Sequence, residues 1–155
     1  MKKKSSGLLM YHLVGDDLEV FLVHPGGPYF AKKDEGAWSI PKGEIEEGED
    51  LLECAIREFH EEIGFLPKGE FIPLDWVKQK GGKVVHAWAF AGEWDNKMRL
   101  KSNLFEIEWP PRSGKIQKFP EIDKAEFFSL SVAVEKINPA QVEFLARLQT
   151  HLLNK

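Results

Sequence analysis

The feature that most constrains this sequence is a segment near its middle with the residue spacing of an amphipathic helix. Between Asp50 and Ile63 the apolar side chains recur every three or four residues, and Gly64 follows at a place where a helix can end. These apolar residues are Leu52, Ala55, Ile56, Phe59 and Ile63. The spacing predicts one helix over about residues 50–63, with a glutamate-rich outer face.

Two predicted β-hairpins flank this helix. Gly15-Asp16-Asp17 joins the first pair of β-rich apolar runs, and Lys80-Gly81-Gly82 joins the second pair. The four predicted strands cover residues 7–14, 18–24, 71–78 and 83–91.

The rest of the chain is expected to complete a mixed fold. We predict short strands at residues 104–109 and 126–130, a loop at 110–114 and a terminal helix at about 139–153. A chain of 155 residues with 43% apolar side chains can bury one sizeable core. We therefore expect a single α+β domain over residues 1–155, with a mixed sheet covered on both faces.

Charge and composition narrow the possible functions. The net charge of −4 offers no general attraction to polyanions, which disfavours a protein that coats nucleic acid or reads its sequence. No run of about 18 apolar residues occurs and no signal-like segment follows the start, so we expect a soluble cytoplasmic protein without a membrane partner. A single cysteine, Cys54, excludes an internal disulfide and a multi-cysteine zinc site, and its place in the helical pattern predicts a small buried side chain.

Three glutamates of the predicted helix share one face. Glu58, Glu61 and Glu62 fall within an arc of about 100°, opposite much of the apolar stripe. Like charges at this spacing disfavour a helix by a few tenths of a kcal/mol per pair, roughly, and a divalent cation would offset that repulsion. Oxygen ligands favour magnesium or manganese over zinc. The competing interpretation is an ordinary solvated acidic face.

A longer motif surrounds these glutamates. Gly43 is followed after five residues by Glu49, and after seven more by Arg57-Glu58-Phe59-His60-Glu61-Glu62-Ile63-Gly64-Phe65. This pattern resembles the Nudix box at every defining position, and the flanking elements are similar to the α/β/α sandwich of that family. The resemblance implies a hydrolase that uses magnesium, or manganese, to cleave a pyrophosphate bond in a nucleoside diphosphate-linked substrate.

The resemblance also implies a role for each residue of the motif. Glu58, Glu61 and Glu62 would bind the metal, with the backbone carbonyl of Gly43 as a further ligand. Arg57 would orient these carboxylates, with Glu49 as its ion-pair partner, although an ordinary surface pair is the simpler alternative.

Family members commonly add a downstream glutamate. Glu121 is placed like that residue, five positions before Glu126, whereas Glu106 and Glu108 are its rivals. The candidates for the general base are Glu58, Glu61 and Glu121.

The segment before the motif bears on the substrate. Residues 38–43, Trp-Ser-Ile-Pro-Lys-Gly, resemble the Trp-x-x-Pro-Lys-Gly segment of dinucleoside polyphosphate hydrolases, which implies a small nucleotide such as diadenosine tetraphosphate. The alternatives are ADP-ribose, a nucleotide sugar, a damaged nucleoside triphosphate or a capped RNA. A Nudix-like sensor that binds nucleotides without catalysis is an alternative from another class, which the complete glutamate set disfavours.

Substrate contacts are expected from cations and rings outside the motif. The phosphate-contact candidates are Lys42, Lys83, Arg112 and Lys115, each of which has surface charge as its alternative. The stacking candidates are Tyr29, Phe30, Trp88 and Trp109, with core packing as the alternative for aromatic residues on strands. The strand histidines, expected to be structural or at the rim, are His12, His24 and His86.

Overall fold

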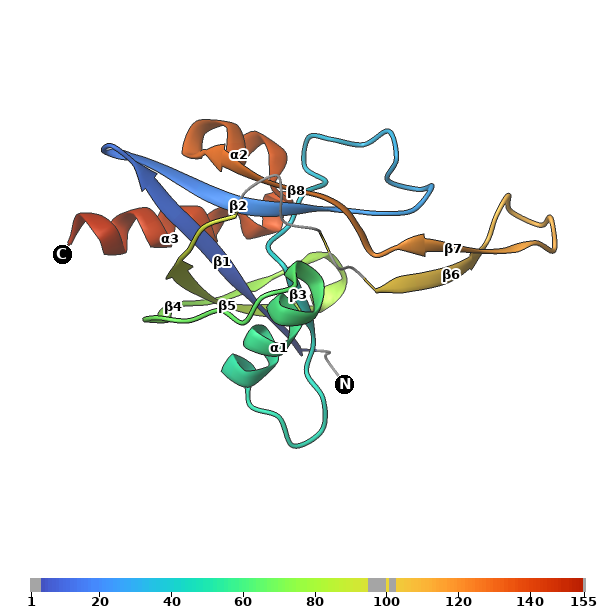
Figure 1. Ribbon diagram of the computed structural model, residues 1–155, viewed down its shortest axis with the longest axis horizontal. Helices are drawn as coiled ribbons and strands as arrows, with labels where there is room; N and C mark the ends of the chain where they lie inside the picture. The colour runs from blue at the N-terminus through green and yellow to red at the C-terminus, as the bar shows by residue number, and fades with distance from the viewer. Residues whose placement is uncertain (1–3, 95–99, 101–102, 155) are drawn as a thin grey trace.

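The computed structural model describes residues 4–94, 100 and 103–154, and a mixed sheet lies at its centre (Figure 1). In spatial order its main strands are β4 (Ile72–Lys78), β5 (Val84–Ala91), β1 (Lys4–Val14), β2 (Asp17–Pro25) and β8 (Ile122–Ser129). A short strand, β3 (Lys42–Glu44), pairs with the first half of β1. β1 and β5 are parallel, and the other neighbouring strands are antiparallel.

Helices cover both faces of the sheet, because the side chains of β1 alternate between two apolar clusters. Leu8 and Met10 point to one face and pack with Phe59 of α1 (Leu51–Ile63). Leu9 and Tyr11 point to the other face, where the second cluster includes residues of α2 (Leu130–Lys136) and α3 (Val142–Leu153). This α/β/α arrangement confirms the predicted fold class (Figure 1).

The central helix begins and ends close to where its sequence predicts. The Asp50 side chain accepts a hydrogen bond of 2.8 Å from the backbone N–H of Glu53, which satisfies a free donor of the first turn. Gly64 ends the helix with a φ of 97°, a left-handed conformation that favours glycine. The helix α1 that carries the glutamates is therefore capped at both ends.

Several elements differ from the sequence-based expectation. The strand predicted at 126–130 begins earlier and spans Ile122–Ser129. It is longer because it pairs with nearly all of β2, from Ile122 opposite Pro25 to Ser129 opposite Glu19. The predicted helix at 139–153 starts with a 3-10 turn over Pro139–Gln141 before α3 begins. Three strands or α-helices were not expected at all: the short strand β3, the short helix α2 and strand β7 (Ile116–Pro120).

Strand β7 belongs to a separate two-stranded sheet. It pairs with β6 (Leu104–Glu108) in an antiparallel hairpin that projects from the body of the molecule (Figure 1). Most of its side chains are exposed, so the usual alternation of apolar and polar residues is missing from its sequence.

Within the described residues, no helix has both the length and the apolar content needed to cross a membrane.

Candidate active site

Arg57 on α1 connects the loop before the helix to the glutamates on it. Its Nε and Nη2 donate to the two carboxylate oxygens of Glu49, at 2.7 and 2.9 Å, which is a bidentate pair. Its Nη1 lies 2.8 Å from Glu58 and 3.5 Å from Glu61. The hydrogen bonds from Arg57 lower the pKa of Glu49 to about 2, so this carboxylate stays charged. The predicted contact between Arg57 and Glu49 is thus present in the structure.

Glu58 lies directly over the backbone of Gly43. A Cβ atom at Gly43 would overlap the Glu58 carboxyl group, so glycine is needed for this close approach. The carbonyl of Gly43 accepts a weak hydrogen bond from the Cys54 thiol at 3.6 Å, and Cys54 is buried as expected. Burial raises the pKa of Glu58, although Arg57 opposes that shift.

Glu62 does not fit the competing interpretation of an ordinary solvated face. Its residue is only 6% exposed, and its Oε2 has no hydrogen-bond partner within the described structure. Burial, reinforced by the charges of Glu58 and Glu121, raises the pKa of Glu62 to about 9. Helical spacing places Glu62 beside Glu58, but the surrounding sheet and loops decide that it is buried.

A small cavity joins Glu62 to the other predicted residues. Its volume is about 230 Å³, and Lys42, Glu62 and Glu121 line it. Its remaining walls are Val23, Pro25, Ser39, Ile40 and Ile122. Four stretches of the chain therefore meet here: the end of β2, residues 39–42 leading into β3, the end of α1, and residues 121–122 at the start of β8.

The downstream carboxylate in this cavity is Glu121. Its backbone N–H donates to Asn103 and its carbonyl accepts from Gly26, both at 2.8 Å, which holds the turn between β7 and β8. The rivals Glu106 and Glu108 lie on β6, and Glu106 faces Lys118 at 3.8 Å. Neither rival lines the cavity.

The predicted phosphate contacts separate into two groups. Lys42 is in the cavity, where burial lowers its pKa and Glu62 opposes the shift. Lys83 is close enough for its charge to lower the pKa of Lys42 further. By contrast, Arg112 and Lys115 lie in the exposed turn of the β6–β7 hairpin.

The predicted stacking residues differ in their exposure and in their ring contacts. Trp88 is half-buried on β5 and Phe30 is 38% exposed, while the rings of Tyr29 and Trp109 meet at 5.2 Å. The histidines have structural surroundings as expected: His12 contacts Glu19 and Glu93, His24 contacts Asp123 and the carbonyl of Lys33, and His86 is half-buried on β5.

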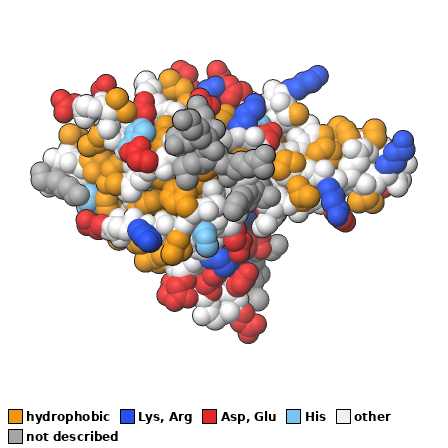
Figure 2. All heavy atoms as spheres, in the orientation of Figure 1, with side chains coloured by type: hydrophobic (Ala, Val, Ile, Leu, Met, Phe, Trp, Pro, Cys, Tyr) orange, Lys and Arg blue, Asp and Glu red, His pale blue; other side chains and the backbone are white. Residues whose placement is uncertain are grey.

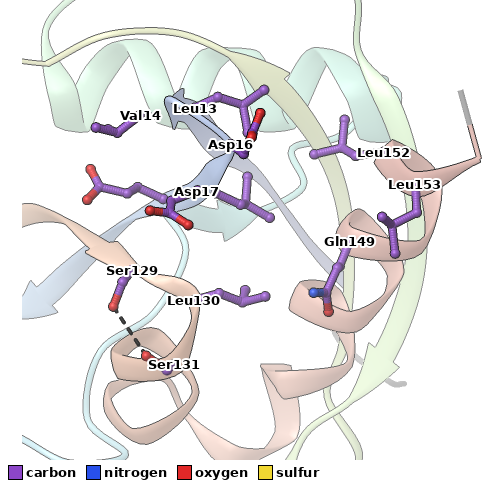
Figure 3. Close-up of a pocket in the computed structure, with 12 residues that line it drawn as sticks. Leu13, Val14, Asp16, Asp17, Ser129, Leu130, Ser131, Gln149, Leu152 and Leu153 are labelled. Carbon is purple, nitrogen blue, oxygen red and sulfur yellow. Dashed lines mark hydrogen bonds between the residues drawn. The ribbon is translucent and has the colours of Figure 1, made fainter.

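A larger cavity lies at the opposite end of β1 (Figure 3). Its volume is about 580 Å³, and it is lined by the β1–β2 turn, the start of α2 and the end of α3. None of the predicted site residues borders it. The acidic side chains instead gather over α1 and the loop before it (Figure 2).

Sequence reasoning missed one residue that shapes the site. Gln141 is fully buried, and its Oε1 accepts a hydrogen bond of 3.1 Å from the backbone N–H of Ile40. Its Nε2 donates to Gln79 at 2.8 Å and to the Ser39 hydroxyl at 3.0 Å. No local pattern signals this role, because the partners are 101, 62 and 102 residues away in sequence.

The donor groups suit a hard divalent cation. These groups are carboxylate oxygens, and one of them, on Glu62, is buried and has no hydrogen-bond partner within the described structure. The Glu58 carboxyl group lies so close to the backbone of Gly43 that a larger residue there would overlap it. Glu58 and Glu61 accept hydrogen bonds from Arg57. Among the described residues, no three Asp, Glu, His or Cys side chains are arranged as a ready-made set of metal ligands.

Two curated relatives match about half of the chain. It is 28% identical over 81 residues to the m7GpppN-mRNA hydrolase of Saccharomyces cerevisiae, covering 49% of this chain and 8% of that protein. It is 33% identical over 79 residues to the asymmetrical bis(5'-nucleosyl)-tetraphosphatase of Rattus norvegicus, covering 46% of this chain and 54% of that protein. The matched region is thus less than two thirds of either relative.

A solved structure shares the whole fold. The crystal structure of a C. elegans Ap4A hydrolase binary complex covers 99% of both chains with a TM-score of 0.65 and 22% identity, a likeness that concerns the fold alone. The family model of the NUDIX domain matches residues 5–148 of this chain, a range that includes the motif and helices from both layers. The resemblance based on residues 43–65 is therefore confirmed, and this chain belongs to the Nudix family.

Proposed function

We propose that this protein is a divalent-metal-dependent hydrolase that cleaves a pyrophosphate bond in a dinucleoside polyphosphate such as diadenosine tetraphosphate. The observation that carries the proposal is the buried, unpartnered oxygen of Glu62 in a cavity shared with Lys42 and Glu121. A carboxylate in that position is costly unless a cation joins it.

The acidic residues would hold the metal. Glu58, Glu61 and Glu62 from α1, the carbonyl of Gly43 and the carboxylate of Glu121 supply oxygen ligands of the kind that magnesium or manganese prefers. When bound, such an ion supplies positive charge against the phosphate oxygens and makes water a stronger acid.

The protein's own residues then divide the remaining tasks. Arg57 holds Glu58 through a 2.8 Å hydrogen bond and ties it to Glu49, which orients the acidic face. Lys42 and Lys83 place positive charge where an outer phosphate would lie. A carboxylate oxygen of Glu58, Glu61 or Glu121 accepts the proton from the attacking water.

Conservative substitutions on α1 test the site. We expect Glu58→Gln and Glu61→Gln to lower kcat by about 100-fold or more, because each removes a charge needed for metal binding or proton transfer. The melting temperature should change little. Glu53→Gln is the matched control, since Glu53 is on the same helix but outside the acidic face. Near-normal turnover in both test variants would refute the assignment.

A substrate panel tests the specificity. With magnesium present, we expect diadenosine tetraphosphate to give a higher kcat/KM than ADP-ribose, a nucleotide sugar, a damaged nucleoside triphosphate or a capped RNA. Faster cleavage of ADP-ribose would exclude the proposed substrate and leave the reaction type intact. Binding without turnover of any of them would instead support the sensor alternative.

Capped RNA is the second candidate, because the match to the yeast m7GpppN-mRNA hydrolase favours it. A cap and a dinucleoside polyphosphate share one chemical form, a polyphosphate bridge with a nucleoside at each end. Both candidates therefore need a place for the second nucleoside.

A further inference from the structure

The projecting hairpin starts beside the cavity lined by Lys42, Glu62 and Glu121, which we call the acidic cavity. We call residues 104–120 the arm; it consists of β6, β7 and the turn between them. Glu121, which lines the cavity, immediately follows the arm, and Gly26 and Asn103 hold its backbone. Five paired positions separate the base of the arm from its turn, a length of roughly 17 Å. The turn thus lies well outside the 230 Å³ cavity.

A second segment follows the arm outward from the cavity. After Pro25 in the cavity wall, Gly26 lies against the backbone of Pro120 at the base of the arm. Gly27 is next to Phe105, where an added Cβ would lie 2.6 Å from the ring. Tyr29 then meets Trp109 beside the turn. Two chain segments therefore run together from the cavity to the end of the arm.

This end of the arm presents aromatic rings to solvent. Tyr29 is 53% exposed, and its ring meets Trp109 at 5.2 Å with an interplanar angle of 77°. Such an edge-to-face pair leaves ring surface accessible, and a nucleobase can stack on it. The next residue, Phe30, is 38% exposed, and the Nζ of Lys33 lies 5.5 Å from its ring centroid.

Two cations lie in the turn that follows Trp109. Arg112 and Lys115 are exposed in the turn, and among the described residues neither has an acidic partner. The turn is held in one shape, since Trp109 donates to the Lys115 carbonyl at 2.9 Å and accepts from the Gln117 side chain at 2.6 Å. Within this turn Arg112 has a φ of 63°, a left-handed conformation that is uncommon outside glycine. Hydrophobic and basic side chains are visible together on the projecting arm (Figure 2).

We propose that Tyr29, Trp109, Arg112 and Lys115 form a second nucleoside-binding site, which holds the far end of a dinucleoside polyphosphate while its phosphate chain occupies the acidic cavity. This inference rests on the proposed function and extends it. The rings would stack on the distal base and the cations would contact the adjacent phosphate. A substrate with one nucleoside would leave this site empty.

Matched substrates test the ring pair. Tyr29→Ala and Trp109→Phe should each be assayed with diadenosine tetraphosphate and with adenosine tetraphosphate, which has the same phosphate chain and one base fewer. We expect Tyr29→Ala to raise KM for the dinucleotide about tenfold, with kcat retained, and Trp109→Phe to have a smaller effect. KM for adenosine tetraphosphate should stay within about twofold. Trp76→Ala is the control, since Trp76 is 48% exposed on β4, which lies at the opposite edge of the main sheet from β8, the strand that follows the arm.

Charge removal tests the turn independently. We expect Arg112→Ala and Lys115→Ala to raise KM for the dinucleotide several-fold and to weaken its dependence on salt. Lys68→Ala, at an exposed lysine in the loop after α1, should have no such effect. Equal changes for both substrates, or no change for either, would overturn the second site. An effect confined to capped RNA would also overturn it, because the site would then serve an RNA chain.

A binding measurement separates this inference from the proposed function. Calorimetry with a methylene-bridged analogue of diadenosine tetraphosphate and magnesium reports occupancy without turnover. If the wild-type protein cleaves no substrate, the proposed function fails; the second site survives only if the analogue binds and Tyr29→Ala weakens it about tenfold. Absence of analogue binding would overturn the second site as well.

Discussion

Arg57 shows how one residue organises an acidic site. It ties Glu49 of the preceding loop to Glu58 on the helix, and it keeps the pKa of Glu49 low. Motif spacing alone predicts these partners, since Glu49, Arg57 and Glu58 are close in sequence. It does not predict that Glu62 is buried, because helical periodicity gives a direction around the helix axis and not what covers it.

Gly43 provides a test at the scale of a single atom. We expect Gly43→Ala to lower kcat by at least about tenfold, because its Cβ would displace the flexible Glu58 side chain from its place beside Arg57. The fold should persist, since a side-chain end moves more easily than backbone. Steady-state kinetics and thermal unfolding measure the two effects. If the loss acts through Glu58, the double variant with Glu58→Ala will be no worse than Glu58→Ala alone.

His12 gives the protein a pH-dependent contribution to stability. Burial disfavours its charged form, but hydrogen bonds with Glu19 and Glu93 outweigh burial and raise its pKa above 6.5. The folded state thus binds the proton more tightly than the unfolded state. This stabilisation is complete below the ordinary pKa and is lost as pH rises through the raised value.

Urea unfolding between about pH 5 and 8 measures this contribution. We expect His12→Gln to lose the part of the pH dependence that falls in the raised window. An unchanged dependence in that variant would show that other groups are responsible.

At the scale of elements, α3 protects an exposed edge of the sheet. Strand β4 is an edge strand, and the outward carbonyls of Leu74 and Trp76 accept hydrogen bonds of 3.0 and 2.9 Å from Nη1 of Arg147. An unpaired edge of this kind is a place where another strand can add. One side chain from a neighbouring layer therefore covers the edge.

Removal of this cover has two expected results. Arg147→Ala should lower the free energy of unfolding by about 1–2 kcal/mol, since hydrogen bonds from a charged donor are lost. It should also increase association at high concentration, which light scattering detects. Lys78→Ala, an exposed residue of the same strand, is the control. A monodisperse and equally stable Arg147→Ala protein would contradict this role.

Elements differed in how well their sequences predicted them. Helix α1 was predicted almost to its ends, because its apolar stripe repeats over several turns and both ends carry capping residues. Helix α2 spans only Leu130–Lys136, too short to show a period, and includes β-branched valines that favour strands. Strand β7 is largely exposed and is stabilised by pairing with β6, so it has no apolar pattern of its own.

At the scale of the whole molecule, Gln141 links the C-terminal layer to the segment that lines the cavity of the candidate active site. The backbone N–H of Ile40 and the side chains of Ser39 and Gln79 all bond to its buried amide. Ile40 is two residues before Lys42 in the cavity. The position of Lys42 therefore depends on the far side of the sheet.

Substitution of Gln141 tests this coupling. We expect Gln141→Ala to lower the free energy of unfolding by about 1–3 kcal/mol, because buried polar groups lose their partner. It should also reduce kcat/KM by shifting Lys42. Gln149→Ala, at an exposed residue of the helix α3 that follows Gln141, should affect neither quantity. A loss of stability with unchanged kinetics would limit Gln141 to a structural role.

The sequence by itself determined the family, the helix that carries the motif and the acidic side chains that we propose as metal ligands, because those features depend on spacing within about 23 residues of chain. Only the tertiary structure decided that Glu62 is buried beside Lys42, that Glu121 rather than Glu106 borders the cavity, and that Tyr29 meets Trp109. Lys42 is 79 residues before Glu121 in the sequence, and Tyr29 is 80 residues before Trp109. The pairing of strands brings these distant segments together. Local periodicity records which face a residue occupies, whereas burial and proximity depend on what the rest of the chain places against that face.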